Sequence, residues 1–396
     1  MPARLHIAMA VIPAHGHINP SLAVVKELVA RGHRVTYLSG SAVAEVVATT
    51  GAEFFSYDSV IQTTENPEGS DPFELMDVYL DDGMAMLERL REIYEDDRPD
   101  LFLYDIAGYA ARILADSWGI PTLQLSPTFV VSKGQEEQMR AGHEAVRQDP
   151  RGAAHLDRFD KWLSDNGASY DPIGLMNEPD RSVVLISSVL QPLAELVDKD
   201  RYTFVGPCFG DRSHQGDWQR ADRTRKLLYI SLGTWVELPE GFARACLDAF
   251  RYQPDWNVVL QAGSRAEEFL AGDVPDNVEI RSWSPQFRLL AEADAFVTHG
   301  GPASVQEGIY HGVPMVAVPQ ANDQFTIADR LVELGVGRRL DTADVTAEAL
   351  RAAVLGLLDD PGVAERLESA SARMRSEGGT EKAVALIEKR LAERTP

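Results

Sequence analysis

The chain has 396 residues, of which 44% are hydrophobic and 25% charged, a composition typical of a folded globular protein and not of a disordered or fibrous chain. Its formal net charge of −23 at pH 7 disfavours binding to nucleic acid or to an anionic membrane surface. The two cysteines are too few for a disulfide framework, the N-terminus lacks a signal-peptide pattern and no apolar run is long enough for a membrane span, so we expect a cytoplasmic protein.

Short β-branched runs alternate with helix-length amphipathic segments through the first half of the chain, a pattern that predicts βαβ units around a parallel sheet. The polar segment 133–170 is expected to be helical, either as an insertion over a site or as a solvated helical pair. We expect strands at 5–12, 34–39, 52–56, 101–104, 122–125, 183–186 and 202–205, and helices at 21–31, 42–50, 72–96 and 107–118.

The α/β alternation restarts after a Gly-, Asp- and Arg-rich segment with little periodicity. We therefore divide the chain into a domain at 1–206, a linker at 207–225 and a second domain at 226–380, with the site expected in a cleft between two Rossmann-like halves. In the second half we expect strands at 227–231, 256–261, 278–281, 295–298 and 315–318, and helices at 241–251, 286–292, 304–311, 324–334, 347–358, 363–376 and 381–394.

The first candidate for chemistry is a pair of side chains that follow two different strands. His15 and His17 come directly after the first strand, and Asp105 directly after the fourth. In a doubly wound sheet these strands are neighbours, so residues just past their carboxyl ends can touch. His17 and Asp105 would then form a pair in which the carboxylate fixes the imidazole tautomer and stabilises its cation. The alternative is that each residue caps the helix that follows it.

The second candidate is the segment THGGPASVQE at 298–307, which follows a strand and opens a helix. Its two glycines let backbone N–H groups approach a ligand closely, and with the helix dipole and a serine hydroxyl they favour a bound phosphate. Its histidine adds a donor that can be cationic, and Glu307 can accept hydrogen bonds from ribose hydroxyls. The alternative is a glycine-rich turn with an ordinary helix cap. The candidate phosphate-binding residues are His299, Gly300, Gly301 and Ser304.

Other motifs narrow the choice of chemistry. Ser231 and Thr234 lie in a second, weaker diphosphate loop after a strand. The chain has no P-loop, and its first βα turn is not the dinucleotide fingerprint, to which 335–340 comes nearest but without the third glycine. No G-x-S-x-G elbow supports a serine hydrolase. The acidic pair Asp198 and Asp200 fits a charged turn better than a metal site, so we assign no metal.

Together these motifs resemble the GT-B glycosyltransferases of the UDP-glycosyltransferase superfamily (family 1), most closely the bacterial macrolide glucosyltransferases, of which the oleandomycin glycosyltransferases are typical. The likeness covers nearly the whole chain. Its most specific part is a nucleotide-sugar signature made of WSPQ at 283–286, H-G-G-x-x-S-x-x-E at 299–307 and DQ at 323–324. The plant members read HCGWNS where this chain reads HGGPAS, so their Trp and Asn contacts do not transfer.

The resemblance implies a GT-B fold and a role for each matching residue. His17 would be the general base that deprotonates the acceptor hydroxyl, with Asp105 as its partner. The C-terminal helix at 381–396 would cross back onto the N-terminal domain. On the donor side, Trp283 would stack on uracil, Gln286 would lie near the nucleoside and Glu307 would hold the ribose. The diphosphate would be held by His299, Gly300, Gly301 and Ser304, with Ser231 and Thr234 nearby. The sugar hydroxyls would be contacted by Asp323 and Gln324.

The resulting expectation is an inverting glucosyltransferase that uses UDP-glucose and needs no cofactor and no metal. Its acceptor would be a hydroxyl of a macrolide antibiotic or a similar hydrophobic natural product, which glucosylation would inactivate. The alternatives are a biosynthetic transferase that uses a deoxysugar nucleotide, a UDP-sugar 2-epimerase on the same fold, and a non-catalytic nucleotide-sugar-binding protein. A site built for sugar hydroxyls favours a fully hydroxylated hexose over a deoxysugar.

Overall fold

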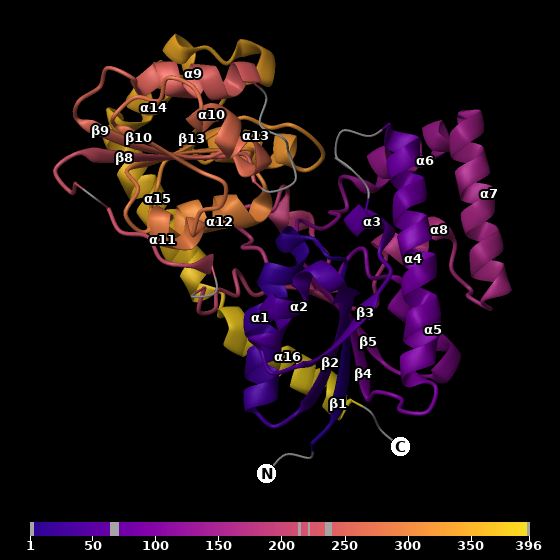
Figure 1. The fold of residues 1–396 in the computed structure, drawn as a ribbon. Coiled ribbons are helices and arrows are strands. Elements are labelled where there is room, and N and C mark those ends of the chain that lie inside the picture. Colours follow the sequence, from indigo (N-terminus) through magenta and orange to yellow (C-terminus); the bar gives the residue numbers. More distant parts are fainter. Residues whose placement is uncertain (1–3, 64–70, 213–214, 221, 234–239, 394–396) are drawn as a thin grey trace. The chain divides into compact units, whose positions relative to one another are not determined.

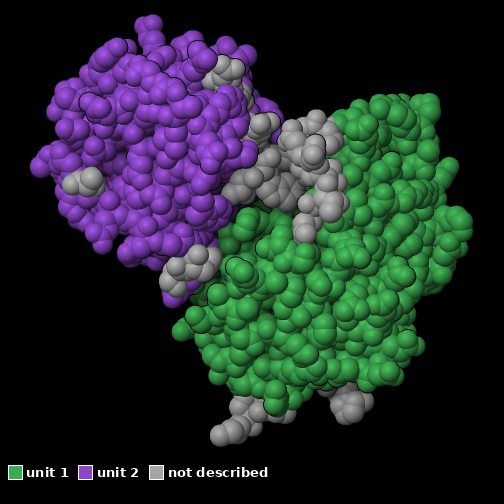
Figure 2. All heavy atoms as spheres, viewed as in Figure 1, with its two compact units in different colours: residues 1–210, 377–396 green, residues 211–376 purple. Residues whose placement is uncertain are grey.

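The computed structural model describes residues 4–63, 71–212, 215–220, 222–233 and 240–393. The chain divides into two compact units, and each is built on a parallel sheet with helices on both faces (Figure 1). Unit 1 comprises residues 1–210 and 377–396, and unit 2 comprises residues 211–376 (Figure 2). Among the described residues, no helix is both long enough and apolar enough to span a membrane.

The sheet of unit 1 has seven strands in the order β3-β2-β1-β4-β5-β6-β7, and every neighbouring pair is parallel. The strand order reverses between β1 and β4, where Ile7 pairs with Leu101 and Ala10 with Tyr104. The first and fourth strands are therefore neighbours, as the sequence predicts. The strands are β1 (His6–Ala10), β2 (Arg34–Gly40), β3 (Glu53–Tyr57), β4 (Leu101–Tyr104), β5 (Thr122–Ser126), β6 (Ser182–Val184) and β7 (Tyr202–Phe204).

Helices cover both faces of this sheet because successive residues of each buried strand point to opposite sides. Ile7 and Met9 of β1 join the core cluster that α1 and α16 complete. On the other face, Phe102 of β4 makes aromatic contacts with Tyr94 of α4 and Trp118 of α5. The helices of unit 1 are α1 (His15–Ala30), α2 (Ala44–Ala48), α3 (Val60–Thr63), α4 (Pro72–Tyr94), α5 (Ala110–Trp118), α6 (Glu136–Gln148), α7 (Pro150–Asp165), α8 (Pro172–Asn177) and α16 (Gly379–Ala392).

Helix α1 begins six residues earlier than the sequence predicts, at His15 instead of Ser21. Pro20 therefore lies inside the helix, although proline has no N–H to donate to the carbonyl four residues back. That carbonyl belongs to Gly16, which is exposed, so solvent can satisfy it. The early start places His17 in the first helical turn, where the helix fixes its backbone.

The sheet of unit 2 has six parallel strands in the order β10-β9-β8-β11-β12-β13, with its reversal between β8 and β11. Helices α9 and α14 lie on one face, and α11, α12 and α15 on the other (Figure 1). Strand β13 was not predicted from the sequence, where its segment reads only as an incomplete glycine motif. The strands are β8 (Lys226–Ser231), β9 (Trp256–Gln261), β10 (Val278–Arg281), β11 (Ala295–Thr298), β12 (Met315–Ala317) and β13 (Gly337–Arg339).

The helices of unit 2 connect its strands or follow its last strand. They include a long pair, α14 and α15, that follows the last strand. The helices are α9 (Glu240–Phe250), α10 (Ala266–Leu270), α11 (Gln286–Leu290), α12 (Pro302–His311), α13 (Gln324–Glu333), α14 (Ala347–Leu358) and α15 (Pro361–Ser376).

Helix α16 belongs to unit 1 although unit 2 precedes it in the chain. It packs beside α1, and its residues Ala383, Val384, Ile387 and Leu391 are part of the unit 1 core. Glu388 of the same helix forms an ion pair with Arg31 of α1 at 3.0 Å. The buried face of α16 is thus part of the hydrophobic core of unit 1.

Replacing Ile387 with alanine should destabilise unit 1 by about 2–5 kcal/mol, because the side chain is fully buried and its removal leaves a cavity. Urea denaturation of the variant measures this loss. Lys389→Ala, on an exposed position of the same helix, is the matched control and should leave the unfolding midpoint unchanged. Equal midpoints for the two variants would contradict a core role for α16.

Candidate active site

The first predicted pair lies at the carboxyl ends of β1 and β4. Nδ1 of His17 and Oδ2 of Asp105 are hydrogen-bonded. The Asp105 side chain is 1% exposed and the His17 side chain 22% exposed. A buried carboxylate therefore orients an accessible imidazole, and Nε2 is the ring nitrogen left for a substrate. This is the arrangement of a general base with its orienting acid.

The second oxygen of Asp105 holds the turn that follows β4. Oδ1 accepts a hydrogen bond of 2.6 Å from the N–H of Gly108. Gly108 must be glycine, since a Cβ there would lie 2.4 Å from the carbonyl oxygen of Ala10. Helix α1 has Ala14 as its N-cap and no side-chain cap among the described residues, so the alternative in which His17 caps this helix is wrong.

In unit 2, the loop after β11 brings a histidine ring against two glycines. Gly301 is the N-cap of α12, and Pro302 occupies its first turn. A Cβ on Gly301 would lie 2.3 Å from Nε2 of His299, and a Cβ on Gly233 would lie 3.0 Å from Cε1 of the same ring. Gly300 has a φ of +85°, the left-handed conformation that favours glycine. Three glycines therefore let the ring and the backbone N–H groups of α12 come together.

The burial of His299 corrects one expectation. Burial lowers the pKa of this histidine to about 4, so the ring is neutral at pH 7 and cannot be the cationic donor that the sequence allowed. Its Nδ1 is buried and has no hydrogen-bond partner in the described part of the chain. The N-terminus of α12 is the remaining group of this loop that favours an anion.

Three predicted donor-site residues are joined by one amide group. Nε2 of Gln286 donates to Oε2 of Glu307 at 2.8 Å and to Oγ of Ser304 at 3.2 Å. All three side chains project from α11 and α12, which lie side by side. Burial raises the pKa of Glu307, whereas the nearby guanidinium of Arg212 and the Gln286 amide oppose that rise. The carboxylate is thus held by partners suited to its charged form.

Trp283 follows β10 and is 40% exposed, a large value for a tryptophan. Its indole Nε1 donates to the carbonyl oxygen of Gln215 at 3.2 Å, which fixes the ring in place. Fixed aromatic rings with an accessible surface are suited to stacking on a planar base.

The other predicted donor residues have structural contacts. Ser231 is buried, and its hydroxyl accepts a hydrogen bond from the N–H of Gly233. Gln324 is also buried, and its Oε1 accepts from the N–H groups of Gln320 and Ala321, which shapes the loop before α13. Asp323 is the N-cap residue of α13. Thr234 lies outside the described residues.

Two further residues contribute to this region and were missed in the sequence. Gln261 links two loops, because its Oε1 accepts from the N–H of Ser284 and its Nε2 donates to the carbonyl of Gly233. Arg212, in the segment interpreted as a linker, is buried beside Glu307. No periodicity or motif marks either residue, since both act through contacts distant in sequence.

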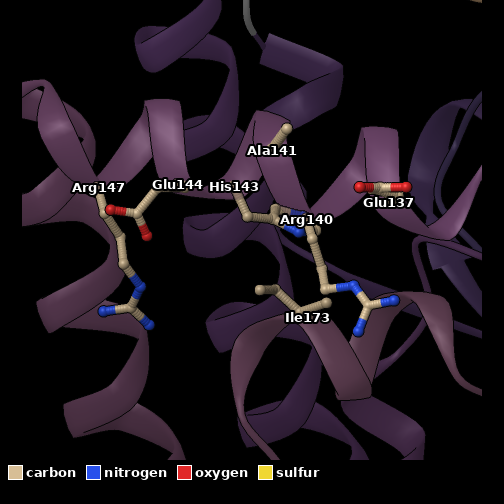
Figure 3. Close-up of a pocket in the computed structure, with 7 residues that line it drawn as sticks. All are labelled: Glu137, Arg140, Ala141, His143, Glu144, Arg147 and Ile173. Carbon is tan, nitrogen blue, oxygen red and sulfur yellow. The ribbon is translucent and has the colours of Figure 1, made fainter.

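Two other features of the described residues do not add to the site. No group of three or more histidine, cysteine, aspartate or glutamate side chains there is placed to hold a metal ion. In unit 1, a surface hollow of about 660 Å³ lies along α6 (Figure 3). Four charged side chains of both signs line it, and none of its residues is among those predicted from the sequence to act in catalysis or donor binding. The lining residues are Glu137, Arg140, Ala141, His143, Glu144, Arg147 and Ile173.

The chain is similar to known glycosyltransferases over nearly its whole length. Residues 247–393 match the erythromycin biosynthesis protein CIII-like C-terminal domain. The chain is 46% identical to the oleandomycin glycosyltransferase of Streptomyces antibioticus, over 98% of this chain and 91% of that protein. It is 34% identical to the NDP-glycosyltransferase YjiC of Bacillus licheniformis, over 98% of each chain.

Two solved glycosyltransferase structures have the same fold as this chain. The glycotransferase of kitacinnamycin superposes with a TM-score of 0.91 at 48% identity, over 98% of this chain and 100% of that one. The calicheamicin glycosyltransferase CalG4 superposes with a TM-score of 0.86 at 31% identity, over 100% of both chains. The fold, the matched domain and these full-length identities place the chain in the GT-B glycosyltransferase family with an EryCIII-like C-terminal domain, and it is a glycosyltransferase.

Proposed function

We propose that this protein is an inverting glucosyltransferase that transfers glucose from UDP-glucose to a hydroxyl of a macrolide antibiotic or a similar hydrophobic natural product, and so inactivates it. The observation that carries the proposal is the hydrogen bond between His17 and buried Asp105, because it provides a base for a hydroxyl acceptor. The 46% identity to an oleandomycin glycosyltransferase supports the choice of a macrolide.

In the proposed reaction, His17 donates its Nδ1 proton to the Asp105 carboxylate in a hydrogen bond and keeps Nε2 unprotonated. Nε2 removes the proton of the acceptor hydroxyl as the acceptor oxygen bonds to the anomeric carbon of glucose. The bond between that carbon and the diphosphate oxygen breaks, and UDP leaves from the opposite face. An α-linked donor therefore gives a β-glycoside, and Asp105 stabilises the imidazolium that forms.

The donor would be held by unit 2. The proposal assigns the uracil to Trp283, the ribose to Glu307, and the sugar hydroxyls to Asp323 and Gln324. The diphosphate would lie at the N-terminus of α12, where fixed N–H groups meet the negative charge that develops on UDP. Because these fixed N–H groups would stabilise the charge on the leaving UDP, the proposal assigns no step to a metal ion.

The test is to incubate the purified protein with UDP-glucose and a panel of macrolides and to follow the products by mass spectrometry, with EDTA present in a parallel sample. We expect a macrolide to gain one hexose with or without EDTA, the NMR coupling of its anomeric proton to identify a β-glycoside, and the product to lose antibacterial activity.

Each other outcome overturns a named part of the proposal. An α-glycoside would contradict inversion, and transfer only from a thymidine-diphosphate deoxysugar would contradict the glucose donor. Conversion of UDP-glucose to an isomer without any acceptor would indicate an epimerase. UDP binding without turnover of any donor would indicate a binding protein.

Replacing His17 with alanine should lower kcat by about 10²- to 10⁴-fold, the contribution of a well-placed general base. The KM for UDP-glucose should change little, because the residues proposed to bind the donor lie in unit 2. His15→Ala, in the same turn of α1, is the control and should retain most of the rate. A near-normal kcat for the His17 variant would rule out the base assignment.

Replacing Trp283 with alanine should weaken UDP binding about tenfold or more, since stacking on an aromatic ring contributes about 1–3 kcal/mol per base. Isothermal titration calorimetry with UDP measures the change. Tyr252→Ala, which removes another exposed aromatic ring of unit 2, should leave the affinity unchanged. Equal affinities of the two variants would show that Trp283 does not bind the base.

A further inference from the structure

Arg212 is a buried cation whose partners are incomplete. The residue is 7% exposed, and its Nε and Nη1 are buried without a hydrogen-bond partner in the described part of the chain. Its Nη2 lies 3.9 Å from Oε1 of Glu307, which is too long for a direct hydrogen bond. Burial lowers the pKa of this arginine, so the position is costly for a charge. A buried guanidinium that stops short of its carboxylate suggests that a third group belongs between them.

The segment that carries Arg212 is attached to the proposed nucleotide site by other contacts. The carbonyl of Gln215 accepts from the indole of Trp283, and Asp217 forms an ion pair with Arg288 of α11 at 2.9 Å. The N–H of Gln215 donates to the carbonyl oxygen of Arg212 at 2.9 Å. Arg212 is therefore placed by the same segment that fixes the proposed base platform.

The two oxygens of Glu307 have different surroundings. Oε2 accepts from Gln286 at 2.8 Å, whereas Oε1 faces Nη2 of Arg212. An oxygen atom at about 2.8 Å from each of two atoms 3.9 Å apart fits between them with ordinary hydrogen-bond lengths. That oxygen must accept from the guanidinium, which only donates, and donate to the carboxylate, which only accepts. A hydroxyl group meets both requirements.

We propose that Arg212 and Glu307 together bind one ribose hydroxyl of the nucleotide, which accepts a hydrogen bond from Arg212 Nη2 and donates one to Glu307 Oε1. This assignment rests on the proposed function, which places the ribose at Glu307. It makes Arg212 a determinant of affinity for nucleotides that carry this hydroxyl. Both bonds involve a charged partner, which makes them stronger than neutral ones.

The test measures binding of UDP, 2′-deoxy-UDP and 3′-deoxy-UDP by isothermal titration calorimetry. The wild-type protein should bind UDP about ten- to a hundredfold more tightly than one of the two deoxy analogues. Arg212→Met should weaken UDP binding by a similar factor and should leave the affinity for that analogue nearly unchanged, because the analogue already lacks the bridging hydroxyl. Arg212→Gln keeps a neutral hydrogen-bond donor on a side chain about two atoms shorter, and it should show the same pattern of losses.

Arg223→Met is the matched control, since it removes an exposed arginine whose ion-pair partner is Glu292 and not a residue of the proposed nucleotide site. It should bind all three nucleotides as the wild type does. Thermal unfolding of each variant identifies those that are folded. If Arg212→Met does not fold, the binding data of Arg212→Gln are the test. Equal losses for all three nucleotides in the Arg212 variants, or a wild type that does not distinguish them, would overturn this role. A wild-type protein that binds neither UDP nor UDP-glucose would instead overturn the proposed function.

Discussion

The reversal of strand order in each parallel sheet is the constraint on which both sites depend. At the reversal, the chain leaves two neighbouring strands toward opposite faces of the sheet, so no helix covers the point between their carboxyl ends. In unit 1 this point lies between β1 and β4, where His17 meets Asp105. In unit 2 it lies between β8 and β11, where the Gly233 turn meets the ring of His299. The proposed chemistry therefore lies where the backbone leaves room for it.

An acidic chain that binds an anionic nucleotide must create its attraction locally. The net charge of −23 opposes such a ligand, and the histidine at the proposed diphosphate loop is neutral. The proposed source of attraction is therefore the N-terminus of α12, whose backbone N–H groups act at short range without a charged side chain. The buried guanidinium of Arg212 is the cation closest to Glu307 in the described residues. In the proposed site, short-range donors thus take the place of a basic surface.

The fold and the residue pairs could be predicted from the sequence because they depend on local signals. Periodic apolar runs identify the strands, and the strand order then brings His17 to Asp105. The rest depends on solvent exposure and on contacts distant in sequence, which local signals do not report. Pro20 predicts a later start for α1, but an exposed neighbouring carbonyl tolerates it. The contacts of Arg212 with an α12 residue and of Trp218 with a β10 residue were not predicted, because each joins residues distant in sequence. The glycines at 335 and 337 resemble a phosphate loop but belong to an edge strand and the turn before it.

The two carboxylates proposed to act in the reaction share one design. Asp105 binds a backbone N–H with Oδ1 and presents Oδ2 to His17. Glu307 binds an amide with Oε2 and presents Oε1 toward Arg212. In each case the anchored oxygen fixes the rotamer while the other oxygen carries the function. Because the side chain is ordered during folding, its conformational entropy is not lost again when the ligand binds. Such anchoring also explains why burial is tolerated: each carboxylate has a partner before any substrate arrives.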